Sequence, residues 1–286
     1  MNPGGTPEPT LRPPSPVRRL GSQARLSVTF YLGLGAPAAR AAFPECRVRA
    51  AAGYTPDFVR TLLAMRRGES DAGTVERINF RCVIISPAGS DQRFFFKDFP
   101  RGHALHDIER AVRCSRVDRA WRAAHLLPRL GILTPRPVGT ILSTEGGEPI
   151  EYLATEWLPN ALPYHVRLRT ADSTETRSRM LDEFARHLRR WHDCGIYLRD
   201  LVTNVLTRES PNGIEYWLTD LDQLHPYRRV TQKRLLHQIR QLARWTGPLG
   251  KEEAEIILRG YLGELAGKGA RAIEQALLTT PPADRV

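Results

Sequence analysis

Four polar residues along this chain have the types that transfer of a phosphoryl group from ATP requires. Lys97 lies in a run of phenylalanines. Asp200 and Asn204 lie four residues apart in a predicted loop, and Asp220 follows twenty residues after Asp200. In such a reaction a cation holds the α- and β-phosphates, one carboxylate receives the acceptor hydroxyl, and an amide and a second carboxylate bind Mg²⁺. The order of these residues therefore predicts an ATP-dependent phosphotransferase.

The scarcity of lysine makes Lys97 conspicuous. Only four of the 42 basic residues are lysines, and strand alternation places Lys97 on one face with Phe95 and Phe99. An ammonium group among aromatic rings on a half-buried strand is costly unless an anion meets it. A plainer interpretation also stands, in which Lys97 reaches solvent at a sheet edge. Likewise, an aspartate in a loop is usually a cap or a turn residue.

The elements that must position these residues predict an α+β protein. The strands of the first half form two hairpins, 77–85 with 93–99 and 138–142 with 150–156, separated by a helix over 103–130. The second half contains helices over 176–194, 232–245 and 251–265, and short strands at 205–207 and 215–219. We expect an antiparallel N-terminal β lobe with one helix over 51–157 and a mainly α C-terminal lobe with the catalytic loop over 158–286. A cleft between two lobes is a favoured site for small ligands.

Composition and charge restrict the partners without identifying one. The chain has 286 residues and a net charge of +11, but residues 1–50, an expected disordered basic leader, hold seven arginines against two glutamates. The rest shows no helix-turn-helix or RNP-like pattern, so we expect no specific nucleic acid partner. A modest basic bias instead suits an anionic substrate.

Cysteine usage and hydropathy indicate a cytoplasmic protein. The four cysteines are far apart and form no CxxC pair, which favours a reduced protein without structural zinc. The uncharged stretch 26–39 is too short, and too broken by glycine and proline, to span a bilayer. It imitates a signal peptide only weakly.

Three segments resemble the lipopolysaccharide kinase (Kdo/WaaP) family, bacterial enzymes of the protein-kinase-like fold. These segments are 119–137, 188–201 and 216–222, within a resemblance that covers roughly residues 74–265. The resemblance implies ATP and Mg²⁺ as cofactors and a hydroxyl of Kdo or heptose in the anionic lipopolysaccharide core as acceptor. It also implies work at the cytoplasmic face of the inner membrane, with peripheral contact there as an option.

The same resemblance implies a role for each candidate residue. Lys97 matches the lysine that pairs with phosphate, Asp200 the catalytic aspartate, and Asp220 the aspartate that binds metal. Asn204 matches the amide that binds Mg²⁺, although it comes one residue sooner after Asp200 than in the usual kinase loop. Glu156 falls at the hinge, where backbone groups rather than side chains usually meet adenine.

One departure from the family pattern concerns the partner of Lys97. The family has a glutamate before the tryptophan of the inserted helix, and this chain has Ala120 there. Glu109 and Asp118 lie elsewhere along or around the same helix, so neither is a comfortable replacement. A further option is that Asp220 itself pairs with Lys97 until nucleotide and metal arrive.

Three other positions also differ. Leu198 replaces the loop histidine, where an apolar residue can pack, and only Gly73 lies near the expected glycine-rich turn. Asp222 either touches the metal or caps the next segment, and capping is favoured. These departures leave two alternatives to a sugar kinase: a pseudokinase that acts as a regulator or docking module, and a kinase for another small molecule.

Overall fold

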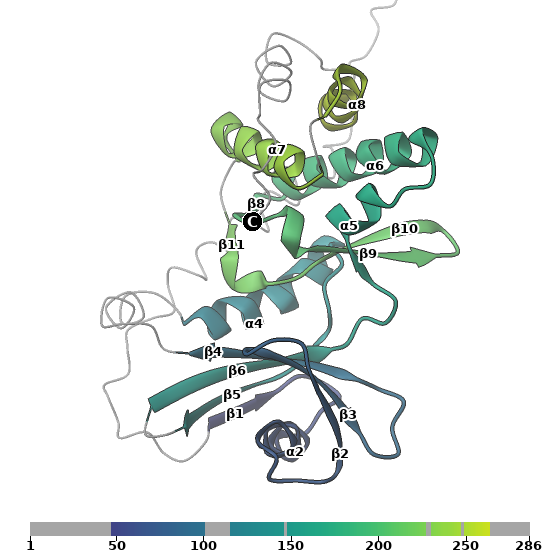
Figure 1. The fold of residues 1–286 in the computed structure, drawn as a ribbon. Helices are drawn as coiled ribbons and strands as arrows, with labels where there is room; N and C mark the ends of the chain where they lie inside the picture. The colour runs from purple at the N-terminus through teal and green to yellow at the C-terminus, as the bar shows by residue number, and fades with distance from the viewer. Residues whose placement is uncertain (1–46, 101–114, 146–147, 227–229, 247–248, 264–286) are drawn as a thin grey trace, which may run out of the picture.

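The computed structural model describes residues 47–100, 115–145, 148–226, 230–246 and 249–263. An antiparallel sheet forms one layer and a group of helices the other, with α4 between them (Figure 1). The predicted leader lies outside the described residues except for its last four, which form the edge strand β1.

The sheet has six strands in the order β1-β5-β6-β4-β3-β2. Its strands are β1 (Arg47–Ala50), β2 (Gly73–Arg77), β3 (Cys82–Pro87), β4 (Phe94–Pro100), β5 (Pro137–Glu145) and β6 (Glu148–Glu156). The predicted hairpin of 138–142 with 150–156 is confirmed as β5 with β6, and that of 77–85 with 93–99 is confirmed over β3 and β4. The predicted strand 77–85 is wrong at its start, because residues 78–81 connect β2 to β3 and leave Ile78 and Phe80 exposed. The antiparallel pairing of β4 with β6 sets Lys97 opposite Leu153 at the centre of the sheet, so Lys97 does not lie on an edge strand.

Among the described residues, helix α2 covers one face of the sheet and helix α4 the other. Helix α2 (Pro56–Arg67) begins at a Thr55 cap, ends at Gly68 in the left-handed region, and packs its apolar side on β3, β4 and β6. Helix α4 (Arg116–Leu126), continued by the 3₁₀ turn η1 (Leu127–Leu130), covers the other face. Within the predicted helix over 103–130, α4 begins at a Ser115 cap, so the helix is not continuous through that residue; residues 103–114 lie outside the described residues.

The helical layer confirms the predicted helices and short strands of the second half. Its elements are β7 (Leu162–Pro163), α5 (Tyr164–Arg169), α6 (Thr174–Asp193), β8 (Ile196–Leu198), η2 (Val202–Asn204), β9 (Val205–Ser210), β10 (Gly213–Leu218), η3 (Leu221–Gln223), β11 (Leu224–Pro226), α7 (Gln232–Thr246) and α8 (Lys251–Leu262). The apolar face of α6 is buried as its spacing predicts, with Met180, Phe184, Leu188 and Trp191 in the core.

The two layers share a hydrophobic core that fixes the cleft between them. Phe99 and Leu153 of the sheet belong to the same buried cluster as α4, α6 and β10. The N–H of Leu218 donates to the carbonyl oxygen of Leu133 at 2.9 Å, which joins β10 to the segment between α4 and β5. Within the described ranges, no helix combines the length and the apolar character that crossing a membrane requires.

Candidate active site

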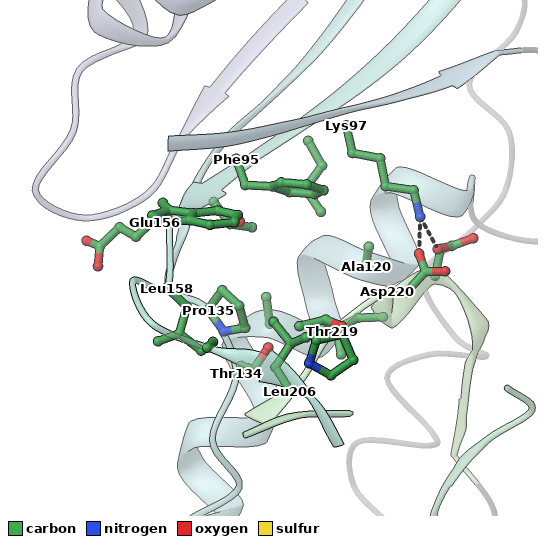
Figure 2. Close-up of a pocket in the computed structure, with 18 of the residues that line it drawn as sticks. Phe95, Lys97, Ala120, Thr134, Pro135, Glu156, Leu158, Leu206, Thr219 and Asp220 are labelled. Atoms are coloured by element: carbon green, nitrogen blue, oxygen red, sulfur yellow. Dashed lines mark hydrogen bonds and ion pairs between the residues drawn. The ribbon is translucent and has the colours of Figure 1, made fainter. Parts of the chain in front are cut away.

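A cavity of about 330 Å³ lies between the sheet and the helical layer. Its walls are mostly apolar, with Phe95 from β4 above and Leu206 from β9 below (Figure 2). Lys97 and Asp220 lie at one end, and Glu156 lies at the other. This combination of apolar walls and a charged end suits a ligand with a flat apolar part and a charged part.

Two carboxylates meet Lys97 at the charged end. Its Nζ donates to Oδ1 of Asp220 and lies 3.4 Å from Oδ1 of Asp222. The ammonium group also lies 4.8 Å from the ring centre of Phe99, a cation–π distance. The anion that the sequence requires for Lys97 is therefore this pair of aspartates.

The pKa values of the two neighbouring aspartates are shifted in opposite directions. Burial and the adjacent Asp222 raise the pKa of Asp220, against the opposing effect of Lys97. Burial alone would raise the pKa of Asp222, but its hydrogen bond with Asp220, together with Lys97 and Arg116, holds that pKa below its usual range. Asp222 is thus the more firmly ionised of the two.

Asp220 has an unusual backbone conformation. Its φ of 52° and ψ of 46° lie in the left-handed region, which costs most residues about 1–2 kcal/mol but which aspartate and asparagine tolerate. The conformation turns the chain between β10 and η3 and directs the Asp220 carboxylate at Lys97 (Figure 2). Strain of this kind at a charged site is typical of functional residues.

Asp222 does not act as the simple cap that the sequence favours. Its side chain is only 1% exposed, and its Oδ2 accepts from Arg116 Nε at 2.7 Å and from Arg116 Nη2 at 2.5 Å. Because Oδ1 faces Lys97 and Oδ2 faces Arg116, both carboxylate oxygens are engaged in the cleft. The sequence carried no signal for Arg116, since its role depends on how α4 packs against η3.

The predicted catalytic loop follows β8 and is tied to α7. Asp200 is exposed and is not among the residues that line the cavity. Gln241 of α7 donates to the carbonyl oxygen of Arg199 at 2.6 Å and accepts from the N–H of Leu201 at 3.2 Å. It also lies 3.4 Å from Oδ1 of Asp200. A single glutamine thus holds the backbone on both sides of Asp200.

Asn204 connects this loop to the metal-binding candidate. Its carbonyl oxygen accepts from both N–H and Oγ1 of Thr219, at 2.9 and 3.1 Å, directly before Asp220. Its side chain is buried, and its Nδ2 has no hydrogen-bond partner among the described residues. Amide and carboxylate oxygens are ligands that Mg²⁺ accepts, so the residue types of Asn204 and Asp220 fit a Mg²⁺ site, although only Asp220 is among the residues that line the cavity. In the described part of the chain, no cluster of three or more His, Cys, Asp or Glu side chains forms a metal site by itself.

Glu156 lies at the far end of the cavity with its carboxylate turned away from it (Figure 2). That carboxylate accepts from the hydroxyl of Tyr54 at 2.5 Å and from Arg136 at 3.3 Å. Burial, together with Glu156, raises the pKa of Tyr54 to about 12. The side chain of Glu156 therefore ties the segment before α2 to the segment before β5, and its backbone N–H donates to the carbonyl oxygen of Arg136 at 2.9 Å.

Comparisons with known proteins agree with this geometry. The model of the lipopolysaccharide kinase (Kdo/WaaP) family matches residues 71–261. The chain belongs to this family. A solved structure described as "WaaP in complex with acyl carrier protein" matches with a TM-score of 0.51 and 16% identity, over 80% of this chain and 99% of that one. That likeness shows the fold, which is protein-kinase-like. A comparison with curated proteins gives no match.

This chain differs from the lipopolysaccharide kinase family pattern at several positions, and the structure shows what each of them contacts. Ala120 is buried and lines the cavity where the family glutamate is expected. Asp118 pairs with Arg49 at 2.5 Å, so it does not replace that glutamate, and Glu109 lies outside the described residues. Leu198 is buried in β8, as its apolar type predicts.

Membership of the lipopolysaccharide kinase family implies phosphotransferase activity, which gives a first test of the loop. Replacing Gln241 by alanine is expected to lower kcat by about tenfold, because the lost hydrogen bonds are worth about 0.5–1.5 kcal/mol each. The KM for nucleotide should change little, since Gln241 lies outside the cavity. Steady-state kinetics check this, with the exposed Arg240 of the same helix changed to alanine as a control. Equal kcat values for both variants would contradict the role of Gln241.

A second hydrogen-bond network fixes α7 against α6 and α8. Nε2 of His192 lies 2.6 Å from Oε1 of Gln238, and its Nδ1 lies 2.9 Å from the hydroxyl of Tyr261. Because an amide oxygen only accepts, Nε2 carries the proton and Nδ1 accepts from Tyr261. Gln238 in turn donates to the carbonyl oxygen of Leu198 at 2.7 Å. Burial lowers the pKa of His192 to about 4, so the ring stays neutral.

Acidification is expected to destabilise the protein through His192. The unfolded chain takes up a proton as the pH falls below about 6.5, whereas the folded protein does so only near its lowered pKa. The free energy of unfolding should therefore fall by about 2 kcal/mol between pH 7 and pH 5 from this group. Chemical denaturation at the two pH values measures the change. His192→Gln should shrink it by that amount, and an unchanged difference would contradict the assignment.

Proposed function

We propose that this protein is a kinase that uses ATP and Mg²⁺ to phosphorylate a sugar hydroxyl of the lipopolysaccharide inner core, on Kdo or heptose. Membership of the lipopolysaccharide kinase family supports the reaction class. The single observation that carries the proposal is the contact of Lys97 with Asp220 at the charged end of an apolar cavity. Such a pair supplies one group for phosphate and one for metal in the same place.

The nucleotide would lie along the cavity with its base toward Glu156. Phe95 and Leu206 offer apolar surfaces above and below for a flat base. The N–H of Glu156 donates to the carbonyl oxygen of Arg136, so it is not open to adenine. The N–H of Trp157 already donates to the carbonyl oxygen of Arg93, so not every hinge group is open to a ligand. The phosphates would then reach Lys97.

In the proposed reaction, Asp200 orients the acceptor hydroxyl and takes its proton as the oxygen bonds to the γ-phosphorus. The bond between that phosphorus and the β–γ bridging oxygen breaks, and ADP leaves. Lys97 holds the α- and β-phosphates, while Asp220 and Asn204 would hold Mg²⁺. The metal supplies charge neutralisation of the phosphate oxygens. The protein gains rate from positioning and charge, since it has little covalent chemistry to perform.

Two structural features support a regulator as the second candidate function. Asp200 lies outside the cavity, and the ammonium group of Lys97 is already engaged by two carboxylates. A pseudokinase that docks partners would tolerate both features. Nucleotide binding separates the two candidates, because a sugar kinase must bind MgATP.

Thermal unfolding with MgATP is the direct test. Ligand at about 100 times its Kd adds roughly 2.7 kcal/mol of stability, which raises the Tm by several degrees. Cys82, which lies opposite Lys97 in the sheet, should also react more slowly with an alkylating reagent when MgATP is present. The absence of both effects at millimolar MgATP would favour the regulator.

The acceptor is tested in cells. Mass spectrometry of lipopolysaccharide from a strain that lacks this protein should show one missing core phosphate. An unchanged core would overturn the proposed acceptor and leave a kinase for another small molecule. We propose a cytoplasmic location, at the periphery of the inner membrane where such an acceptor lies, and the basic bias of the chain suits that anionic substrate.

A further inference from the structure

We propose that Asp222 replaces the missing helix glutamate as the lasting partner of Lys97, and that Arg116 holds Asp222 in place for this role. Asp222 is then a positioning residue for the phosphate-binding lysine. This inference rests on the proposed kinase function and deepens it. It concerns only what keeps Lys97 in position once Mg²⁺ and nucleotide are bound.

The first support is the geometry of Asp222 itself. Its side chain is 1% exposed, whereas that of Asp220 is 23% exposed. Arg116 binds Oδ2 through two nitrogens, a charge-assisted contact that fixes the carboxylate plane, and Oδ1 is left 3.4 Å from Lys97. Arg119 Nε also donates to the backbone oxygen of Asp222 at 3.3 Å. Asp222 is therefore held from two sides by α4.

The second support is the charge that α4 brings to the cleft. Arg116 and Ala120 lie four residues apart on α4 and share a face of the helix. Where the family has an acidic side chain, α4 has only the methyl group of Ala120. One turn earlier, α4 carries the cationic side chain of Arg116. That cation cannot pair with Lys97 directly, but it can hold a carboxylate that does. Asp222 therefore lies between the cations Arg116 and Lys97 and connects α4 to Lys97.

The third support is that a metal ion bound to Asp220 would compete with Lys97 for its carboxylate. Oδ1 of Asp220 accepts a close hydrogen bond from the ammonium group of Lys97. If Asp220 binds Mg²⁺, that contact weakens, and Lys97 needs another anion to remain extended toward the phosphates. Asp222 is the neighbouring carboxylate already within 3.4 Å of the ammonium group. Because its other oxygen is occupied by Arg116, it is better placed for Lys97 than for the metal.

The decisive variant is Asp222→Asn, tested on the full chain with wild type alongside. Calorimetric titration is expected to show MgATP affinity lowered by about 10- to 100-fold, the usual worth of one hydrogen bond to a charged group, because a mispositioned Lys97 loses its contact with the phosphates. The KM for ATP should rise in proportion, while the Mg²⁺ concentration for half-maximal activity stays unchanged. Restoring a carboxylate by Ala120→Glu in the Asp222→Asn background should recover most of the affinity.

Each other outcome has a definite meaning. A raised Mg²⁺ requirement without rescue by Ala120→Glu would overturn the proposal and make Asp222 a metal ligand. Unchanged ATP affinity in Asp222→Asn would also overturn it. Failure of wild type to bind MgATP would instead refute the kinase function, so the two failures are distinguishable.

A second variant covers the case in which glutamate at the buried position 120 does not fold. Arg116→Gln leaves the cavity wall untouched and is expected to lower MgATP affinity in the same direction, by less than Asp222→Asn. The exposed Arg129, in the turn that follows α4, serves as a matched control, and Arg129→Gln should bind as wild type does. Equal affinity of the Arg116 and Arg129 variants would contradict the role of Arg116.

Discussion

Replacement of Asp200 by asparagine is expected to lower phosphotransfer by about 10²–10⁴-fold, the usual contribution of a positioned general base. Asparagine keeps the size of the side chain but cannot accept the proton of the acceptor hydroxyl. The loop should keep its shape, because Gln241 binds the backbone of Arg199 and Leu201 rather than depending on the Asp200 carboxylate. Single-turnover assays with the lipopolysaccharide acceptor measure the loss.

Binding of MgATP should survive in the Asp200 variant, since Asp200 does not line the cavity. The increase in Tm with MgATP is therefore expected to equal that of wild type. A matched control is Asp193→Asn, which removes an exposed carboxylate paired with Arg189 at 2.9 Å on the helix before the loop. That change should leave transfer nearly intact. Full transfer by the Asp200 variant would remove the residue from the mechanism.

Elements with a strong internal pattern could be predicted from the sequence, and elements that depend on a distant partner could not. The hairpin of β3 and β4 alternates apolar residues around a clear turn, so its pattern is local. Strand β1 has only four residues, alternately exposed and half-buried, and pairs with β5 about 90 residues later. Helix α2 was not predicted, although the Thr55 cap and Gly68 at its two ends are local signals. The composition of the preceding segment masked them.

The same distinction between local patterns and distant partners applies to the candidate site. The sequence placed Lys97 and Asp220 in one site and gave their pairing only as one option; the structure shows that contact, although 123 residues separate them. The pairing of Arg116 with Asp222 could not be predicted, because it depends on the rotation of α4 against η3 rather than on a motif. The role of Gln241 was missed for a similar reason. Only the packing of α7 shows that this glutamine reaches the backbone beside Asp200.

Replacement of Asp220 by asparagine is expected to abolish the stabilisation by MgATP and to lower phosphotransfer by at least about 10²-fold, because a carboxylate ligand of the metal is lost. Asparagine is the informative substitution here. It tolerates the left-handed backbone of Asp220, whereas alanine would add strain to the turn between β10 and η3. Thermal unfolding with and without MgATP, together with the transfer assay, measures both effects.

Without nucleotide, the same variant should not lose stability. Burial and Asp222 raise the pKa of Asp220, so its ionised form at pH 7 destabilises the folded state relative to the unfolded chain. A neutral amide removes this penalty, and Lys97 keeps Asp222 as its partner. The Tm of the nucleotide-free variant is therefore expected to equal or exceed that of wild type. A lower Tm with an intact response to MgATP would mean that Asp220 is a structural partner of Lys97 and that the metal binds elsewhere.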